Sequence, residues 1–496
     1  MSEEKFTIAV IGTGAIGVSM ISNLINDFCK AKINNIRIIA CEEREISGPG
    51  IVYQPDHDSI ILNRTANNMS VLSTDKNHFA NWLIENRYPS SILDSYLPRQ
   101  IFGEYLKSTL KKTIEDALEF NIELELIQNS VESIIPNKEQ YYLTAGNKQY
   151  DINRIILCVG NLRSNRYIDL LGGKNYFHTP YPTNKITHLR NSKKSIGIIG
   201  SRLSAMDTVI SLKNMGYKGA ITLLSRQGYL PSVMFKQKKV PLRYCTEAKI
   251  SYLKSKTGGN LSYRTVLRLV LKELSIGCGY QFSVKYQKPK NANAVEIFKR
   301  DLKNEMKNEN GWQDSFVALN AVICELWNSL SDKDQKKFRQ FDFSRFMALR
   351  VPIPKIIAKE VEYLFDSGQL NMISGLESIV YSNEMYSAKF KNGASKSFDI
   401  IINCTGPENN ISETKVPLFI SLKESGHITP HSLGGVNVNF YTNKAIHSDG
   451  ISETGIFVVG NLTSGTHLFC SILEINTLFC KRVSETLLKE YIQVIA

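Results

Sequence analysis

Three glycines near the start of the chain have a spacing that suits phosphate binding. Gly12, Gly14 and Gly17 follow the apolar run 6–11 and precede a helical pattern. In such a motif the first glycine permits a tight turn, the second lets backbone N–H groups approach a pyrophosphate, and the third allows a helix to pack on a strand. Glu42 ends the next apolar run and can accept hydrogen bonds from ribose hydroxyls. The sequence therefore predicts a dinucleotide-binding turn.

A second copy of this pattern begins at residue 195, but its middle glycine is replaced. Gly200 fits the tight turn and Ala205 fits the close packing of helix on strand, whereas Arg202 stands between them. The arginine side chain can either block a pyrophosphate or pair with a phosphate through its guanidinium group, and both readings stay open. The residues that we expect to hold a second cofactor at this turn are Gly200, Ser201, Arg202 and Ser204.

The ends of the two second strands differ in charge. Cys41-Glu42-Glu43 in the first copy lines up with Leu224-Ser225-Arg226 in the second. A carboxylate repels a 2′-phosphate on the adenosine ribose, whereas a hydroxyl and a cation bind one. We therefore expect FAD at the first turn and NADPH, rather than NADH, at the second, with Ser225 and Arg226 on the 2′-phosphate. Arg226 has a second reading as an ordinary surface arginine.

Short apolar runs alternate with helical patterns around both turns. Runs that end in small residues, at 155–160 and 400–406, come late in their units. A further run at 455–460 precedes a helical pattern over 468–490. This order predicts an α/β fold with two Rossmann-like dinucleotide-binding domains, for FAD and NADPH, and a helical insertion. We expect the FAD domain over 1–190 and 408–496, the NADPH domain over 191–235 and 344–407, and the basic helical insertion over 236–343.

Most of the net positive charge comes from one segment. The chain has a formal net charge of +13, and residues 236–307 hold 17 lysines and arginines against 5 acidic residues. Such a segment can attract an anionic cofactor or substrate, or it can be an ordinary solvated surface. It contains no recognised nucleic-acid-binding motif, so nucleic acid is not the expected partner. Its tyrosines nevertheless interleave with the cations, at Tyr252, Tyr263, Tyr280 and Tyr286.

The cysteines and the apolar segments exclude several classes of protein. None of the 9 cysteines forms a C-x-x-C pair or a His/Cys cluster with zinc spacing, so we expect reduced thiols and no metal. Residues 48–63 contain no cysteine, whereas flavin disulfide reductases carry a redox pair shortly after their first dinucleotide motif. The N-terminus lacks the pattern of a signal peptide, and no apolar run approaches the roughly 18 residues of a membrane span. We therefore expect a cytoplasmic protein without a membrane partner.

Five stretches together resemble a known family. They are Gly12–Gly17, Gly48–Tyr53 with Ile61–Ser70, Leu97–Leu106, Ile221–Pro231, and Asn403–Pro407 with Gly460 and Gly465 beyond it. They resemble the bacterial FAD/NAD(P)-binding flavoprotein monooxygenases that include aspartate N-monooxygenases, and more distantly the ornithine and lysine N-hydroxylases. The stretches at 48–70 and 221–231 are fairly specific. The insertion matches only near Trp312 and 350–352.

The resemblance implies that FAD lies against the loop containing Asn63, Asn68 and Met69. Amide side chains can bond flavin atoms without carrying charge, although such a loop can also use asparagine for turn geometry alone. Arg99 and Tyr105 are expected to open a helix near the same site, or to pack on its surface. The other residues that we expect at FAD are Gly160, Gly460 and Asn461, the last standing where many flavoproteins have an aspartate on the ribityl chain.

The family implies an FAD- and NADPH-dependent monooxygenase. In that reading NADPH reduces the flavin, molecular oxygen forms a flavin C4a-(hydro)peroxide, and this species hydroxylates a small amine or amino acid on nitrogen. This explains why no catalytic triad, carboxylate pair or metal set is visible, and it leaves the catalytic residues unknown. Two alternatives stay open: an NADPH-dependent flavoprotein reductase or dehydrogenase that inserts no oxygen, and a non-enzymatic polyanion-binding protein. Hydroxylation of carbon instead of nitrogen is also open.

Overall fold

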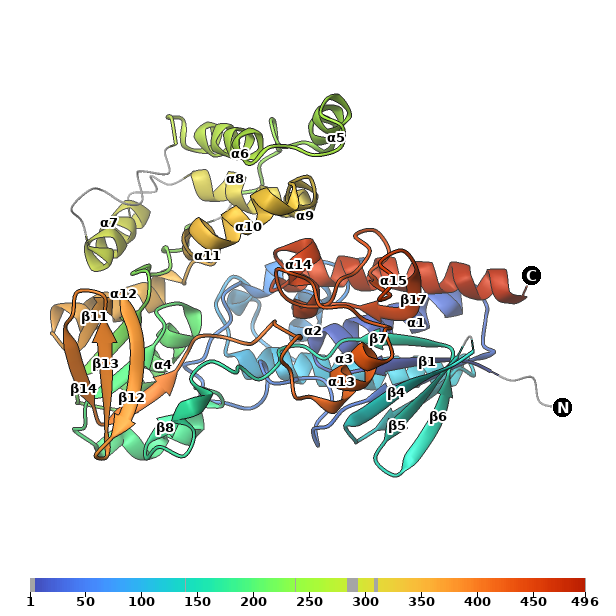
Figure 1. The fold of residues 1–496 in the computed structure, drawn as a ribbon, viewed down its shortest axis with the longest axis horizontal. Coiled ribbons are helices and arrows are strands. Elements are labelled where there is room, and N and C mark those ends of the chain that lie inside the picture. Colours follow the sequence, from blue (N-terminus) through green and yellow to red (C-terminus); the bar gives the residue numbers. More distant parts are fainter. Residues whose placement is uncertain (1–4, 139, 237, 283–292, 307–310, 496) are drawn as a thin grey trace. The chain divides into compact units, whose positions relative to one another are not determined.

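Two compact units make up the computed structural model, which describes residues 5–138, 140–236, 238–282, 293–306 and 311–495 (Figure 1). The first unit comprises Met1–Pro55, Arg64–Leu162 and Glu408–Ala496, and the second comprises Asp56–Asn63 and Arg163–Pro407. Each unit is discontinuous in sequence, because the chain leaves one sheet, builds a second one and then returns to the first.

The first unit is built on a six-stranded sheet in the order β16-β17-β7-β1-β2-β3. Its strands are β1 (Phe6–Ile11), β2 (Ile36–Cys41), β3 (Glu123–Ile127), β7 (Arg154–Leu157), β16 (Lys444–Ile446) and β17 (Glu453–Val458). All neighbouring strands pair in parallel except β16 and β17. Every residue of β1 is buried, as expected for the apolar run of a strand that is covered on both faces.

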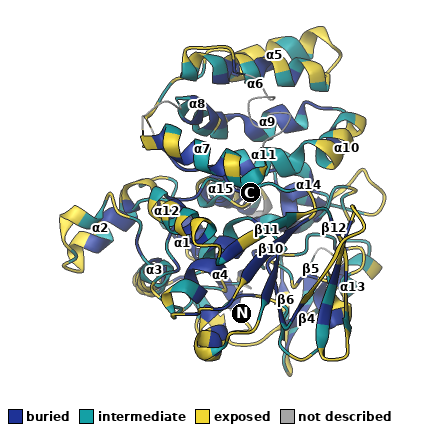
Figure 2. Ribbon diagram, turned by 90° about the vertical axis from the view of Figure 1, so that its left-hand side faces the viewer, coloured by how far each residue is buried: buried dark blue, intermediate teal, exposed yellow. Residues whose placement is uncertain are grey.

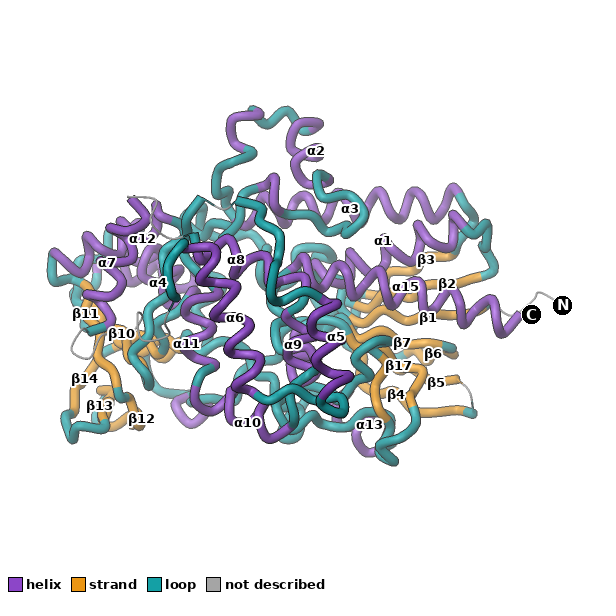
Figure 3. The backbone as a smooth tube through the Cα atoms, turned by 90° about the horizontal axis from the view of Figure 1, so that it is seen from above, coloured by secondary structure: helices purple, strands orange, loops and turns teal. Residues whose placement is uncertain are grey.

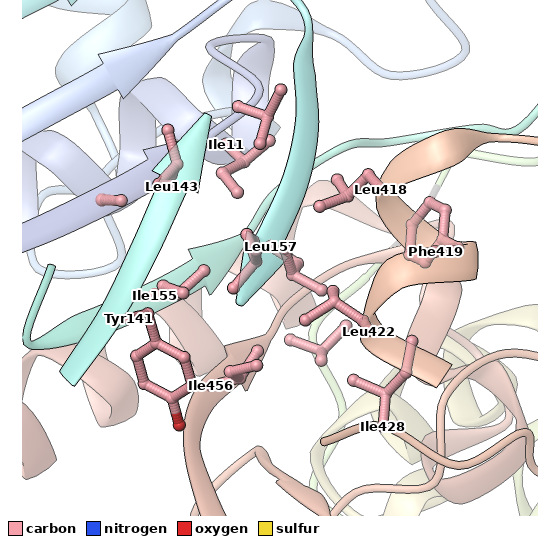
Figure 4. Close-up of a cluster of buried hydrophobic side chains, with 14 of the residues drawn as sticks. Ile11, Tyr141, Leu143, Ile155, Leu157, Leu418, Phe419, Leu422, Ile428 and Ile456 are labelled. Carbon is pink, nitrogen blue, oxygen red and sulfur yellow. The ribbon is translucent and has the colours of Figure 1, made fainter. Parts of the chain in front are cut away.

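The two faces of this sheet are covered by different elements. Helices α1 (Ala15–Lys30), α3 (Arg99–Glu119) and α15 (Leu473–Ile495) lie on one face, where α1 contacts the other two. A small antiparallel sheet covers the other face, formed by β4 (Val131–Asn137), β5 (Gln140–Ala145) and β6 (Lys148–Ile152), with helix α13 (Pro417–Glu424) packed on β4. Leu418 and Leu422 of α13 share a buried cluster with Ile11, Leu143 and Leu157 (Figure 4).

Two shorter helices complete the first unit, α2 (His78–Glu85) and α14 (Ser464–His467). The helix expected over 468–490 starts later than predicted, because Leu468 has a φ of +60° and ends α14, so that α15 begins at Leu473. Among the described residues, no helix is both long and apolar enough to cross a membrane.

The second unit has a five-stranded parallel sheet in the order β11-β10-β9-β15-β8. Its strands are β8 (Tyr176–Phe177), β9 (Ile196–Ile199), β10 (Ile221–Ser225), β11 (Leu370–Ser374) and β15 (Ile400–Asn403), and its helices α4 (Leu203–Asn214) and α12 (Lys355–Asp366) contact each other. A second antiparallel sheet contains β12 (Leu376–Ser382), β13 (Met385–Phe390) and β14 (Ser395–Phe398). Every residue of β10 is buried (Figure 2), whereas in β11, the edge strand, only Leu370 is buried.

Residues 163–190 belong to the second unit, although we expected the FAD domain to reach residue 190. The reason is β8, which pairs in parallel with β15 of the second sheet. The segment 56–63 is attached to the same unit through Asp56. Its carboxylate accepts hydrogen bonds from the backbone N–H of Thr183 at 2.9 Å and from the Thr183 hydroxyl at 2.6 Å.

All the secondary-structure elements in the described residues of the segment 236–343 are helices (Figure 3). Its helices are α5 (Glu247–Lys256), α6 (Tyr263–Cys278), α7 (Ala294–Met306), α8 (Trp312–Ala318), α9 (Ile323–Asn328) and α10 (Asp332–Phe341), followed by α11 (Phe343–Arg350). Gly277 and Gly311 allow α6 to approach the start of α8, since a Cβ at Gly311 would lie 2.1 Å from the carbonyl oxygen of Gly277. Residues 237, 283–292 and 307 of the basic segment lie outside the described residues.

Candidate dinucleotide-binding sites

The turn after β1 is so tight that two of its glycines are required by packing. Gly12 has a φ of +92°, and a Cβ there would lie 2.6 Å from the carbonyl oxygen of Cys158. A Cβ at Gly17 would lie 2.0 Å from the carbonyl oxygen of Gly12. A side chain at either position would push α1 away from the end of β1. The tight turn and the close helix packing expected from the sequence are therefore both present.

Gly14 differs from the other two glycines because a Cβ there would clash with no atom of the protein. The nearest atom to a Cβ at Gly14 would be the Cα of Gly50, at 3.5 Å, which is ordinary van der Waals contact. Gly14 is also the N-cap of α1, where no side chain makes a capping hydrogen bond. Free N–H groups at the start of a helix attract an anion. The start of α1 therefore has the polarity that the pyrophosphate of a dinucleotide requires.

Glu42 is buried at the end of β2 and is already hydrogen-bonded within the protein. One carboxylate oxygen accepts from the backbone N–H and the hydroxyl of Thr13, at 3.0 and 3.2 Å. The other accepts from the backbone N–H and the guanidinium group of Arg44, at 3.3 and 2.9 Å. These bonds use the four acceptor positions of a carboxylate. The ribose contact that we expect of Glu42 therefore requires Arg44 to give up a bond.

The remaining FAD candidates of this sheet follow its neighbouring strands. Gly160 comes after β7 with a φ of +72°, and no atom lies within 4 Å of a Cβ built on it. Gly460 comes after β17 with a φ of +102°, and Asn461 starts a short 3-10 helix directly after it. Because the carboxyl ends of parallel strands meet at one edge of a sheet, these residues share that edge with the glycine turn and Glu42.

The asparagine loop is arranged less simply than the sequence suggested. Asn68 is exposed, and its side-chain N–H bonds the hydroxyl oxygen of Thr65 at 2.8 Å, which is a turn-stabilising contact. Met69 is buried, and its N–H bonds the carbonyl of Ala66. Asn63 ends the segment that clusters with the second unit, whereas Asn68 and Met69 belong to the first. The contacts of this loop with FAD stay a prediction.

Arg99 opens α3 as expected, directly after the N-cap Pro98. Tyr105, six residues further on, is buried, and its hydroxyl lies 2.7 Å from Nδ1 of His78 and accepts the N–H of Val71 at 3.2 Å. Burial raises the pKa of the Tyr105 hydroxyl and lowers the pKa of His78. Tyr105 thus fastens α3 to the segment 71–78, which supports the packing role that we considered for it.

The turn after β9 reproduces the geometry of the first turn. Gly200 has a φ of +114°, and a Cβ there would lie 2.8 Å from the carbonyl oxygen of Cys404, just as one at Gly12 would approach Cys158. The N–H of Gly200 bonds the carbonyl of Leu224 at 2.9 Å, as the N–H of Gly12 bonds that of Cys41 at 2.8 Å. The register inferred from the sequence, with Arg202 at the place of Gly14, therefore holds in the structure.

The serines of the second turn are used inside the protein. Ser201 is buried, and its hydroxyl donates to the carbonyl of Tyr229 at 2.6 Å. Ser225 is also buried, and its oxygen accepts the N–H of Gly228 at 3.0 Å. Both serines therefore help to hold the loop after β10 in shape, and their contact with a cofactor stays a prediction. Ser204, in the first turn of α4, is only partly buried.

Three guanidinium groups gather at the carboxyl end of the second sheet. Arg202 is partly buried, and this burial together with the nearby charges of Arg226 and Arg166 lowers its pKa. Arg166 was not predicted as a site residue. It belongs to the second unit because Asn403, at the end of β15, donates to its backbone carbonyl at 3.1 Å. The pair of arginines in the stretch 163–166, soon after an apolar run, was the signal available in the sequence.

A family model matches the part of the chain that contains the first turn. Residues 9–162 match the model described as FAD-NAD(P)-binding. The first unit contains an FAD/NAD(P)-binding domain. The class of cofactor expected from the glycine motif is thereby confirmed. Within the described ranges, the chain has no group of three or more His, Cys, Asp or Glu side chains placed to hold a metal ion.

Solved flavoprotein structures are similar to this chain over nearly its whole length. L-lysine 6-monooxygenase from Pseudomonas syringae has a TM-score of 0.61 at 13% identity, over 97% of this chain and 99% of that chain. The Kutzneria sp. 744 ornithine N-hydroxylase, solved with reduced FAD, NADP+ and L-ornithine, has a TM-score of 0.61 at 11% identity, over 98% and 100%. Bacillithiol disulfide reductase from Staphylococcus aureus has a TM-score of 0.51 at 12% identity, over 98% and 99%.

At these identities the likeness establishes the fold. The expected α/β architecture with two dinucleotide-binding domains is confirmed, and the hydroxylases among these structures agree with the family resemblance found in the sequence. No curated protein matches the chain in sequence.

Proposed function

We propose that this chain is an FAD- and NADPH-dependent monooxygenase that hydroxylates the nitrogen of a small amine or amino acid. The observation that carries the proposal is the pair of equivalent turns, in which Gly12 lies under Cys158 and Gly200 lies under Cys404. An enzyme that passes a hydride between two dinucleotides needs two such cradles. The fold shared with lysine and ornithine hydroxylases over almost the entire chain supports the same reaction.

In this proposal the residues of the first unit bind and orient FAD. Gly14 and the uncapped start of α1 bind the pyrophosphate, and Glu42 accepts a hydrogen bond from a ribose hydroxyl. Gly160, Gly460 and Asn461 line the same edge of the sheet. Asn68 and Met69 belong to the asparagine loop described above, and Arg99 is the first residue of α3. FAD, when bound, supplies the hydride acceptor and the oxygen chemistry.

The second unit binds NADPH in this proposal, and the extra phosphate selects the nucleotide. In the alignment of the two turns, Arg226 after β10 takes the place of Glu43 after β2, next to Ser225 at the place of Glu42. A cation at this place favours a 2′-phosphate, which a carboxylate repels. Because Ser225 is buried and bonded to Gly228, we assign the phosphate to the arginines alone. The substrate of the reaction is proposed by chemical class only, as a primary amine or an amino acid, with molecular oxygen as the second substrate.

An NADPH-dependent flavoprotein reductase is the second candidate, because a disulfide reductase has a similar fold. One internal observation disfavours a reductase that works through its own cysteines. The cysteines of this chain are all free, and most are buried. Burial raises the pKa of Cys41, Cys404 and Cys480 to about 12, which keeps these thiols protonated and unreactive.

The two candidates are separated by measuring where the electrons go. The purified, flavin-loaded protein is mixed with NADPH, oxygen and a panel of amino acids and diamines, and NADPH consumption is compared with hydroxylated product by mass spectrometry. A monooxygenase gives product in proportion to NADPH with at least one amine. Consumption of NADPH with one hydrogen peroxide per NADPH, and no hydroxylated product from any member of the panel, would contradict the proposal. A purified protein that takes up no flavin would contradict both candidates.

A further inference from the structure

The second nucleotide turn carries a large charged side chain where the first leaves open backbone. Arg202 is the N-cap of α4 with φ −108° and ψ −159°, and Gly14 is the N-cap of α1 with φ −66° and ψ −169°. The N–H of Met206 bonds the carbonyl of Arg202 at 2.9 Å, as the N–H of Val18 bonds that of Gly14 at 2.9 Å. The backbone of the two turns is thus equivalent, and only the side chain differs.

The backbone conformation does not explain why this position holds an arginine. Both N-caps have negative φ, so neither position demands glycine for conformational reasons. In the first turn no side chain projects from this position, and the nearest atom to a Cβ there would be the Cα of Gly50 at 3.5 Å, so backbone N–H groups can bind a pyrophosphate directly. In the second turn the side chain of Arg202, which ends in a guanidinium group, projects from the equivalent position. It must either exclude a pyrophosphate or bind it.

The surroundings of Arg202 favour binding. Arg226 and Arg166 are close enough to lower its pKa, and none of the three has an acidic partner among the described residues. Clustered cations that are partly removed from water repel one another unless an anion joins them. A side chain that merely filled the turn would gain nothing from two further guanidinium groups beside it. The cluster has the electrostatics of a site for a ligand with several negative charges.

The three arginines also have the spread of an extended ligand. Arg202 follows β9, Arg226 follows β10, and Arg166 is attached to the end of β15 through Asn403. Since β9 lies between β10 and β15, the cations sit at the carboxyl ends of three adjacent strands. Neighbouring strands lie about 4.8 Å apart, so the row spans roughly 10 Å. The place where connections leave to opposite sides of a central strand is also where such sheets bind nucleotides.

We propose that Arg202 binds the pyrophosphate of NADPH through its guanidinium group, in place of the open backbone that a glycine provides, while Arg226 binds the 2′-phosphate. Arg166 adds a third positive charge beside them. The inference rests on the proposed use of NADPH by the second unit. A guanidinium group suits both roles, because its planar shape lets it form two parallel hydrogen bonds to phosphate oxygens. The turn then selects a diphosphate by a side chain instead of by bare N–H groups.

Two ligands separate the two phosphate contacts. NADP+ contains the pyrophosphate and the 2′-phosphate, whereas 2′-AMP contains only the latter. Isothermal titration calorimetry of the full-length, flavin-loaded protein gives the affinity for each at one fixed ionic strength. We expect R202G to weaken NADP+ by about tenfold or more, as the loss of a charge-assisted bidentate contact implies, and to change 2′-AMP by less than about twofold. R226A should weaken both ligands.

Controls distinguish this role from a general effect of charge or folding. R202K keeps the charge but loses the planar pair of donors, so we expect a loss for NADP+ that is intermediate between wild type and R202G. R190A removes an exposed arginine before β9, at the opposite edge of the sheet, and should change neither ligand. Circular dichroism and flavin content establish that each variant is folded and loaded.

The outcomes separate the inference from the function on which it rests. If R202G binds NADP+ as tightly as the wild type, or more tightly, Arg202 fills or blocks the turn and the inference is wrong, while the use of NADPH stands. If R202G weakens NADP+ and 2′-AMP equally, Arg202 does not address the pyrophosphate and the inference is again wrong. If the wild-type protein binds neither ligand, both the inference and the proposed use of NADPH fail.

Discussion

The carbonyl oxygen of Cys158 lies only 2.6 Å from the place where a Cβ of residue 12 would sit, so Gly12 cannot carry a side chain without moving the backbone. This relationship makes the turn after β1 a rigid part of the fold. Packing requires Gly12 and Gly17 but does not require Gly14, so substitutions at the two kinds of position should have different effects.

Gly12→Ala and Gly14→Ala should differ in what they damage. Gly12→Ala places a Cβ against the Cys158 carbonyl at a φ of +92°, so we expect a loss of about 2–4 kcal/mol in the free energy of unfolding. Gly14→Ala meets no atom closer than 3.5 Å, so the fold should keep its stability. The new methyl group occupies the pyrophosphate space, however, and FAD should bind at least about tenfold more weakly. Denaturant titration and flavin titration test the pair, and equal flavin affinity in Gly14→Ala and wild type would refute the assignment of the cradle.

Arg44 and Glu42 should have opposite effects on flavin affinity. Glu42 accepts two bonds from Thr13 and two from Arg44. Glu42→Ala removes the ribose acceptor and the support of the turn, so FAD binding should be lost or strongly reduced. Arg44→Ala removes a competitor for the same carboxylate, so FAD should bind as tightly as in the wild type or up to a few-fold more tightly. Fluorescence titration of the apoprotein with FAD measures both. A large loss of affinity in Arg44→Ala would show that Arg44 itself serves the cofactor.

His467 should make the protein less stable in mild acid. Its ring is fully buried beside Phe479, at 4.4 Å between ring centroids, and neither ring nitrogen has a hydrogen-bond partner. Burial, with a smaller contribution from the charge of Arg482, lowers its pKa to about 3 from an ordinary 6.5. Below pH 6.5 the imidazole of His467 is therefore protonated in the unfolded chain but stays neutral in the folded chain. The free energy of unfolding consequently falls as the pH drops towards 3.

The size of this effect follows from the two pKa values. Between pH 7 and pH 5 the wild type should lose about 2 kcal/mol from this residue alone. His467→Phe has no such proton, so the difference in unfolding free energy between wild type and variant should change by that amount over the same interval. Denaturant titrations of both proteins at several pH values measure it. A difference that stays constant with pH would mean that the ring is hydrated or partnered in solution.

Glu273 should be essential for the stability of the helical insertion but not for cofactor binding. Its buried carboxylate accepts backbone N–H groups of Arg243, Tyr244 and Cys245 at 2.7 to 3.1 Å. Glu273→Leu leaves these donors unsatisfied, and we expect a loss of about 2–4 kcal/mol. Glu247→Gln, on the exposed first turn of α5, should change stability by less than about 0.5 kcal/mol. Thermal denaturation compares the two, and similar midpoints would contradict the structural role.

The sequence was sufficient for the parts of the fold that depend on local constraints. Gly12 and Gly200 each need a positive φ beside a strand end, and the apolar runs around them are buried on both faces, so the turns and both parallel sheets were predictable. The antiparallel sheets were not, because their strands are short and only half-buried. The strand β8 has two residues, which is too short for any pattern to reveal, and it moved the boundary between the units.

The sequence allowed most residues of the candidate site to be predicted, but not the contacts that each of them makes. Arg202 and Arg226 were found by alignment of the two turns, whereas Arg166 depends on a contact with Asn403, which is 237 positions away in the chain. Ser225 has the residue type of a phosphate ligand, but whether its hydroxyl turns to a ligand or to Gly228 depends on a loop conformation that residue types do not specify. The same holds for Asn68, whose amide bonds its own turn through Thr65.

The bond between Glu42 and Arg44 has a consequence for how this protein matures. A buried acid without a partner would make the empty protein unstable until its cofactor arrived. Here the acid is already neutralised by a residue two positions further along the chain, so the first unit can fold and persist before any flavin is available. Binding of FAD would then exchange the Arg44 bond for a ribose bond at a carboxylate that is already held in place.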